Sequence, residues 1–347
     1  MKHLPVLAVV LALLGPSAAH AAAADLYTVP GVEVDATAES ATAARDRALV
    51  QGQPAAWQRL FRRLTPPQVW NRQPALDFAV LQRMIRSYEV ANERRSTTRY
   101  LAEITYTFDE GEVQRVLRQA SVPFADVQAR PVLVIPLTTG VFDPATPWAQ
   151  AWALSPIARG LVPVILPEGD ALDQPILGRE DAATLEWTDL EPLAVRYEVA
   201  QVVIANATPD GFSAQLSIVS ATGRQIESLA FARSTFAATA DAAAQRIAEG
   251  WKARSAVDYS QRARITADVA FADPADWPRI RNRLAAVRTV TEVNLVGISV
   301  NEARLELTFF GRAEQLRDAM AQQNLSFTGG AGNYLLRLGA PAPAARP

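Results

Sequence analysis

Hydrophobic and polar positions follow two different periods in the first third of the chain. Apolar residues alternate with polar ones over 26–36 and 100–108, which is typical of strands with one buried face. Between these strands the apolar residues recur every three or four positions, as in amphipathic helices. Helices are expected around 44–49, 57–64, 78–85 and 113–117. This pattern predicts an N-terminal α+β domain that spans residues 22–128.

Two local signals mark the ends of the first predicted helix. Ser40 stands just before it, and its hydroxyl can accept a hydrogen bond from an amide at the helix start. Gly52, Gln53 and Pro54 follow its last apolar position. Proline lacks the amide hydrogen and disfavours helical backbone before it. We therefore expect one helix to end here and a second one to begin.

The middle of the chain has longer apolar runs. Residues 132–137 are apolar without interruption, which is typical of a strand covered on both faces. Further strands are expected at 162–166, 201–205, 212–218 and 226–232, the last two as a hairpin. Helices are expected around Trp148 and Trp152, over 189–198 and over 240–251. Spaced four residues apart, the two tryptophans favour the core over a binding groove. The order β-α-β-α-β-β-β-α predicts a mixed-sheet α/β domain over 129–252.

The last third follows a polar stretch, 253–262, that we expect to be a linker. Strands are predicted at 265–271, 290–300, 303–309 and 334–338, and helices at 277–287 and 313–320. This βαββαβ order predicts a ferredoxin-like domain over 263–338. The glycine-rich run 328–333 lacks the following helix that a phosphate loop needs, which favours a hairpin connection. Residues 339–347, rich in Pro and Ala, are expected to be a disordered tail.

The first residues have the layout of a secretory signal peptide. Lys2 precedes an apolar run from Leu4 to Leu14, and Ala19-His20-Ala21 fits a cleavage site. The run is shorter than the ~20 residues that a membrane-spanning helix needs, which disfavours an uncleaved anchor. No later segment is apolar enough to cross a membrane. We expect residues 1–21 to be removed and the mature chain to be periplasmic.

Composition excludes several kinds of chemistry. The chain has no Cys, and both histidines, His3 and His20, lie in the predicted signal peptide. Catalysis by Ser-His or Cys-His and zinc or copper sites are therefore not expected. A Ser–Lys pair would have to use Lys252 with Ser255. We expect Lys252 at the exposed end of a helix, with an ordinary high pKa and a role in the helix dipole. No catalytic residue, metal or cofactor is predicted.

Acidic residues raise two weaker possibilities for a functional site, a calcium or magnesium site and a glycosidase site. The cluster Asp109–Glu112 lacks the ligand spacing of a calcium loop and favours the start of a helix. Paired carboxylates such as Glu168 with Asp170, or Glu180 with Asp181, are the groups that a glycosidase uses. Such pairs occur in any chain with 36 acidic residues, so a carboxylate-only hydrolase is kept as a minor alternative.

Arginine is concentrated in the first domain. Residues 57–99 contain nine arginines and three acidic residues. The guanidinium group binds phosphate and carboxylate through a planar fork, so anionic lipid, glycan or an acidic protein are suitable partners. A solvated arginine-rich face is the alternative. The overall charge of −2 gives no reason to expect nucleic acid binding. The candidate binding residues are Arg59, Arg62, Arg63, Arg94 and Arg95.

Several short segments together resemble a known bacterial family. DLYTV, ARDRAL, LFRRLT, YLAEITYTFDEGEVQRVLRQASVPF and RPVLVIPL occur in the order found in the family called domain of unknown function 2066. The resemblance covers about residues 26–137. The chain has Thr65-Pro66-Pro67 where that family has a glycine. The resemblance implies a protein associated with the bacterial envelope and assigns no catalytic residue. The order of elements in 129–252 is similar to the N-terminal domain of the TolB family.

These observations predict a protein without catalytic activity. We expect a periplasmic scaffold or adaptor that binds other envelope proteins through the surfaces of its domains. The alternatives are a module that binds anionic lipid or glycan through the arginine-rich face, and a carboxylate-only hydrolase. Salt separates the first two, because binding to an anionic surface weakens as ionic strength rises.

Overall fold

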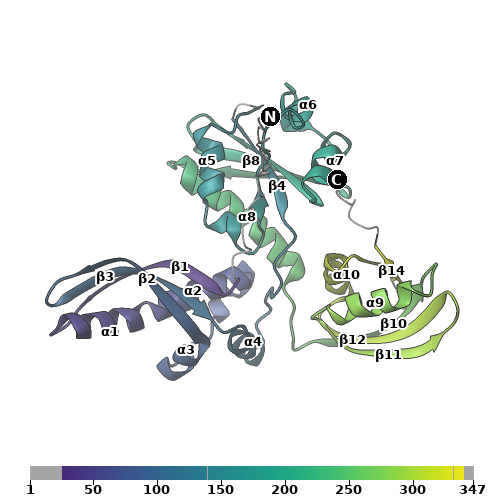
Figure 1. Ribbon diagram of the computed structural model, residues 1–347, viewed down its shortest axis with the longest axis horizontal. Coiled ribbons are helices and arrows are strands. Elements are labelled where there is room, and N and C mark those ends of the chain that lie inside the picture. The colour runs from purple at the N-terminus through teal and green to yellow at the C-terminus, as the bar shows by residue number, and fades with distance from the viewer. Residues whose placement is uncertain (1–25, 139, 331, 340–347) are drawn as a thin grey trace, which may run out of the picture.

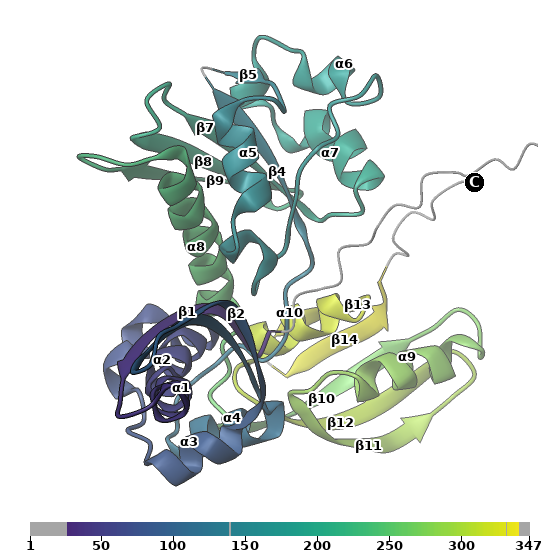
Figure 2. The ribbon, with the colours of Figure 1, turned by 60° about the vertical axis from the view of Figure 1, so that its left-hand side comes forward.

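The computed structural model describes residues 26–138, 140–330 and 332–339, and these form three sheets that each carry their own helices. Figure 1 shows the first and last sheets on opposite sides of the molecule, with the middle one above them. Figure 2 shows the same three bodies meeting near the lower end of α8. The α+β, multidomain character predicted from the sequence is confirmed. The predicted signal peptide and nearly all of the predicted tail lie outside the described residues.

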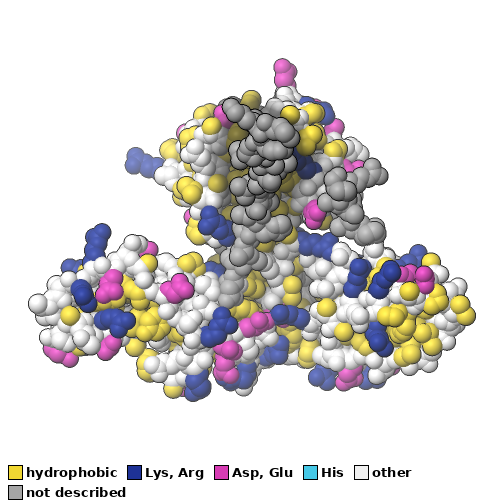
Figure 3. All heavy atoms as spheres, viewed as in Figure 1, with side chains coloured by type: hydrophobic (Ala, Val, Ile, Leu, Met, Phe, Trp, Pro, Cys, Tyr) yellow, Lys and Arg dark blue, Asp and Glu magenta, His cyan; other side chains and the backbone are white. Residues whose placement is uncertain are grey.

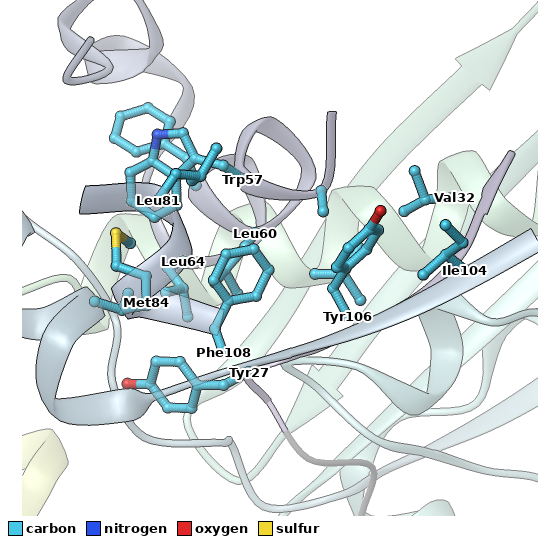
Figure 4. Packing of buried hydrophobic residues seen from close by; sticks show 14 of the residues in the cluster. Tyr27, Val32, Trp57, Leu60, Leu64, Leu81, Met84, Ile104, Tyr106 and Phe108 are labelled. Carbon is cyan, nitrogen blue, oxygen red and sulfur yellow. The ribbon is translucent and has the colours of Figure 1, made fainter. Parts of the chain in front are cut away.

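The first domain is a three-stranded antiparallel sheet in the order β1-β3-β2. Helices α1 and α2 pack on one face of this sheet, and their apolar residues form one core with the buried residues of β1 and β3 (Figure 4). Every second residue of β3 is buried, as the alternation predicts. The elements are β1 (Thr28–Thr37), α1 (Ala41–Gln51), α2 (Gln53–Leu64), a 3-10 turn (Pro67–Arg72), α3 (Phe78–Met84), β2 (Ile85–Arg95), β3 (Arg99–Phe108) and α4 (Glu110–Gln119).

The predicted helix signals are confirmed in α1 and α2. The Ser40 Oγ accepts a hydrogen bond from the Ala43 amide at 3.2 Å and caps α1. Gly52 separates the two helices, and Pro54 lies in the first turn of α2. A Cβ at Gly52 would collide with the hydroxyl of Tyr106, which donates a hydrogen bond to the carbonyl of Leu49 at 2.8 Å. The break between α1 and α2 thus depends on a close approach that only glycine permits.

The middle domain contains the predicted elements in the predicted order, with β5 and α6 in addition, around a mixed sheet, β5-β4-β7-β8-β9, with β6 beside β4. Strands β4, β6 and β7 are parallel, and β7, β8 and β9 are antiparallel. Helices α5 and α8 cover one face and α7 the other. The bounds are β4 (Val132–Thr138), β5 (Val141–Phe142), α5 (Pro147–Leu154), β6 (Val164–Ile165), α6 (Gln174–Leu177), α7 (Trp187–Arg196), β7 (Gln201–Ala207), β8 (Ser213–Ser220), β9 (Gly223–Ala230) and α8 (Phe236–Ser255), with 3-10 turns at Ile157–Arg159 and Ala182–Thr184.

Both tryptophans of α5 belong to the core, as their spacing predicts. Trp148 and Trp152 are buried, and their rings meet edge to face with centroids 5.6 Å apart. The Trp148 indole donates a hydrogen bond to the carbonyl of Ala205 at 2.9 Å. Its polar group therefore has a partner inside the core, as a buried indole needs.

The third domain has five strands, in the order β11-β12-β10-β14-β13. The elements are β10 (Arg262–Ala270), α9 (Asp276–Ala285), β11 (Val290–Ile298), β12 (Glu302–Phe310), α10 (Ala313–Gln322), β13 (Leu325–Gly330) and β14 (Asn333–Leu338). The four-stranded ferredoxin-like plan is not confirmed, because β14 runs parallel to β10 and separates it from the additional strand β13. The predicted hairpin connection is confirmed, since β13 and β14 pair up to Gly330 and Asn333.

Candidate functional site

The three domains meet around the segment that follows α8. Phe124 of the first domain and Val257 exchange backbone hydrogen bonds at 3.2 and 3.0 Å. The Tyr259 hydroxyl donates to the buried carboxylate of Asp126 at 2.6 Å. Burial raises the pKa of Asp126, while the hydrogen bond from Tyr259 opposes that rise. Helix α8 continues to Ser255, and the residues after it pack between domains, so part of the predicted linker 253–262 is built into the junction.

The third domain is tied to the other two by polar contacts. The Gln315 side chain donates to the carbonyl of Ala256 at 2.5 Å. The guanidinium of Arg130, at the start of the middle domain, donates to Asn324 Oδ1 at 2.5 Å. Arg288 forms an ion pair with Glu110 of the first domain. These contacts join all three domains and hold their surfaces in a defined arrangement.

The prediction that Lys252 is exposed, with an ordinary pKa, is wrong. Its side chain lies between α8 and the first domain and is only 1% exposed. Its Nζ donates to the carbonyl of Arg62 at 2.7 Å and lies 5.5 Å from the Trp70 ring centroid. Burial lowers the pKa of Lys252 to about 8. The Ser255 hydroxyl donates to the carbonyl of Trp251 at 2.9 Å, so no bond links Ser255 to Lys252 among the described contacts.

A cleft of about 490 Å³ lies between the first and middle domains, beside Lys252. Its basic side chains come from α2 and α8, and its apolar walls come from β1, Trp70 and the loop after α5. Glu249 also lines it and is bound to its neighbours Arg246 and Gln245. The lining residues include Val29, Pro30, Arg59, Arg62, Arg63, Trp70, Pro156, Ile157, Leu161, Ala248, Glu249 and Lys252.

The structure divides the five candidate arginines into two groups. Arg59, Arg62 and Arg63 lie on α2 and line the cleft. Arg59 donates to the carbonyl of Gly31 at 2.8 Å, and Arg63 to that of Thr28 at 2.6 Å, so β1 fixes both side chains. The remaining two arginines, Arg94 and Arg95, lie at the end of β2 in the β2–β3 hairpin. Arg94 borders a shallow surface hollow with three acidic residues, Glu33, Asp35 and Glu103.

The acidic alternatives gain no support from the geometry. Asp109 caps α4 by accepting from the Glu112 amide at 2.9 Å, which confirms the helix-start interpretation of that cluster. Arg196 binds Asp170 at 2.6 Å and holds the pKa of that carboxyl at about 2. Arg179 binds Asp181 and lowers its pKa as well. Asp170 and Asp181 are therefore unsuited to the role of the general acid of a glycosidase, and the carboxylate-only hydrolase stays a prediction. No group of metal-ligating side chains occurs among the described residues.

One of the two free edges of the sheet in the third domain, β11, exposes apolar side chains. Strand β11 lies at the edge of its sheet, and none of its residues is Lys, Arg or Pro. Leu295, Val296 and Ile298 are 51%, 64% and 54% exposed. Figure 3 shows hydrophobic side chains gathered on this side of the third domain. Residue patterns predicted the strand, but its edge position depends on the order of strands in the sheet.

Comparisons with known proteins give no relative: no family model, no curated protein and no solved structure matches this chain. The resemblance to the family called domain of unknown function 2066, and the similarity of the middle domain to TolB, therefore stay predictions. Within the residues that the structure describes, no helix has the length and apolar character needed to cross a membrane.

Proposed function

We propose that this protein is a non-catalytic adaptor of the bacterial periplasm, and that it holds a partner protein by adding a strand of that partner to β11. The observation that carries the proposal is the open, apolar edge of the third domain. Edge strands present unpaired backbone groups that can pair with another chain, and strand addition is a common mode of peptide recognition. The apolar run Leu4–Leu14, with its cleavage-like residues, supports the periplasmic location.

The partner strand is defined by the face on which the exposed residues lie. Val293 is paired with Leu307 and Leu295 with Leu305, and both partners in β12 are buried. Directly opposed residues share a face of the sheet, so Val293 and Leu295 lie on the face that α9 and α10 cover. The apolar core therefore continues past the last strand. A partner with apolar residues at alternate positions would extend both the hydrogen-bond ladder and this core.

Both edges of the first sheet and the β9 edge of the middle sheet are protected against such pairing, whereas β13, the other edge of the third sheet, has neither charged residues nor proline. Strand β2 carries five charged residues among its eleven. Strand β1 contains Pro30 and two acidic residues, and β9 contains Arg224 and Glu227. Charged side chains and proline are the usual means by which native edges avoid pairing. Strand β11 differs from these edges, β13 included, in exposing several large apolar side chains, which supports a role for this edge in binding.

Photo-crosslinking in the native host tests the proposal. A photoreactive amino acid at Val296 is expected to crosslink a partner protein, whereas the same group at Ile226 of β9, which is 55% exposed, is not. Leu295→Lys should abolish the crosslink from position 296, because the added charge would be buried against the partner strand. Equal capture at both positions, or capture that survives Leu295→Lys, would contradict strand addition at β11.

A further inference from the structure

The cleft between the first and middle domains is lined by more positive than negative side chains. Lys252 is buried, and its one hydrogen bond among the described residues goes to a backbone carbonyl. Arg62 lies over the Trp70 ring, with the guanidinium carbon 5.1 Å from the ring centroid, and makes no ion pair among the described residues. Within the part of the chain that the structure describes, Arg59 donates to the backbone carbonyls of Pro30 and Gly31. Of these three side chains only Lys252 is buried, and a buried charge is normally paired because it loses the stabilisation that water gave it.

The one carboxylate within the cleft, Glu249, attracts Lys252 electrostatically but is shared with other partners. Glu249 forms an ion pair with Arg246, with Nη1 and Oε2 3.7 Å apart, and accepts a hydrogen bond from Gln245 at 3.1 Å. Three cationic side chains, Arg59, Arg62 and Lys252, thus line the cleft beside this one acid. The imbalance favours an anion, and guanidinium groups together with an ammonium group are the donors that bind phosphate.

The other walls of the cleft are apolar. Ile157 and Leu161 face it from the middle domain, and Val29 and Pro30 from β1. The volume of about 490 Å³ lies in the range of small-molecule sites, which combine apolar walls with a few placed polar groups. A bare anion would leave most of this surface uncovered. The cleft therefore fits a ligand with a charged head and an apolar body.

We propose that this cleft binds an amphiphilic phosphate, with the phosphate held by Arg59, Arg62 and Lys252 and the apolar body packed against Ile157 and Leu161. The ligand would contact α2 of the first domain and α8 of the middle domain at once, and it would thereby strengthen their association. This site is separate from the β11 edge and does not depend on the proposed partner. The phosphate group is the shared chemistry of two sources, a phospholipid headgroup and a water-soluble phosphate ester.

Isothermal titration calorimetry with residues 22–347 and three probe molecules tests the proposal. A soluble short-chain phosphatidic acid below its micelle concentration is expected to bind, the matching phosphatidylcholine to bind more weakly, and inorganic phosphate to bind weakest. Arg62→Gln should weaken the phosphatidic acid by about tenfold or more, as for the loss of a charged hydrogen bond. Arg94→Gln, in the same domain but outside the cleft, should leave the affinity unchanged. Leu295→Lys, at the β11 edge and outside the cleft, should also leave the affinity for phosphatidic acid unchanged.

The source is then identified with vesicles and with a soluble phosphate ester. Binding to vesicles that contain phosphatidic acid, lost in Arg62→Gln, indicates a membrane lipid. Binding of an aromatic phosphate ester without vesicle binding indicates a soluble ligand. Both results support the site. If inorganic phosphate bound as tightly as the phosphatidic acid, the proposal that the ligand is amphiphilic would be contradicted. If Arg94→Gln and Arg62→Gln weakened binding equally, the assignment of the site to this cleft would be contradicted. Because Arg62 is exposed, its substitution leaves the core intact, and circular dichroism checks this.

Discussion

The burial of Lys252 leads to a quantitative prediction about pH. Its pKa falls from an ordinary value of 10.5 to about 8 in the folded protein because the ammonium is removed from water. A difference of this size corresponds to roughly 3 kcal/mol. Between pH 8 and 10.5 the unfolded chain binds more protons at this position than the folded chain. The free energy of unfolding should therefore rise with pH across this window, by up to roughly 3 kcal/mol.

The chain makes this prediction easy to measure, because Lys252 is the one lysine of residues 22–347. Lysine labelled with ¹³C at the ε-carbon gives a single resonance, which should titrate near pH 8 in the folded protein. In urea it should titrate near the model-peptide value of about 10.4. Lys252→Met keeps the apolar stem and removes the charge. Its free energy of unfolding, measured beside that of the unsubstituted protein, should lack the rise between pH 8 and 10.5.

Two results would refute the reasoning. A titration midpoint at pH 10 or above in the folded protein would show that Lys252 is solvated and that the first and middle domains are not packed together there. A constant difference in stability between Lys252→Met and the unsubstituted protein from pH 7.5 to 10.5 would lead to the same conclusion. Tyrosines that also titrate at high pH affect both proteins equally. The difference between the two free energies of unfolding therefore reports on Lys252.

Two further substitutions test the packing of the first domain and the junction. Gly52→Ala should destabilise the first domain by about 1–3 kcal/mol in urea unfolding, because the added methyl group collides with Tyr106, and Tyr106→Phe should restore part of this loss. No loss in Gly52→Ala would refute the close approach. Tyr259→Phe should cost about 1–3 kcal/mol at pH 7, because the buried Asp126 loses its hydroxyl donor. Tyr88→Phe, at a half-exposed tyrosine, is the matched control, and an equal effect there would contradict the role of the junction.

Sequence patterns predicted the elements whose signal is local. The alternation in β3 and the continuous apolar run of β4 appear as the expected strands, because their side-chain period follows from burial on one face or on both. The spacing of Trp148 and Trp152 likewise predicted core residues. These features depend on neighbours within a few residues, which a single sequence contains.

The strands that pattern reasoning missed have little buried surface. β2 is exposed along nearly its whole length and carries charges instead of alternating apolar residues. In β13 only Leu325 and Phe327 are buried, and the strand ends in two glycines. Strand β13 changes the third domain from a four-stranded to a five-stranded sheet. Pairing with a neighbouring strand, rather than side-chain burial, holds such segments, and pairing is not visible in a local pattern.

The candidate sites depend on contacts between domains, which explains why the sequence predicted them only in part. The concentration of arginine indicated α2, but Arg94 and Arg95 lie on a different element from the cleft. Lys252 was expected at an exposed helix end, because its burial comes from Trp70 and Arg62, about 180–190 residues earlier in the chain. The exposure of β11 follows from the order of strands in its sheet. Each of these facts needs the relative position of segments that are far apart in the chain.

Hydrogen exchange at β11 tests the central claim, that this edge accepts a partner strand, most directly. The exchange rates of the amides of residues 290–298 would be measured in the free protein. They would be measured again in its complex with the partner protein that the crosslink at Val296 identifies. The account predicts that the outward-facing amides of β11 exchange fast in the free protein and become protected on binding, while those of the β9 edge keep their rates. Unchanged exchange in β11, with the partner bound, would contradict strand addition.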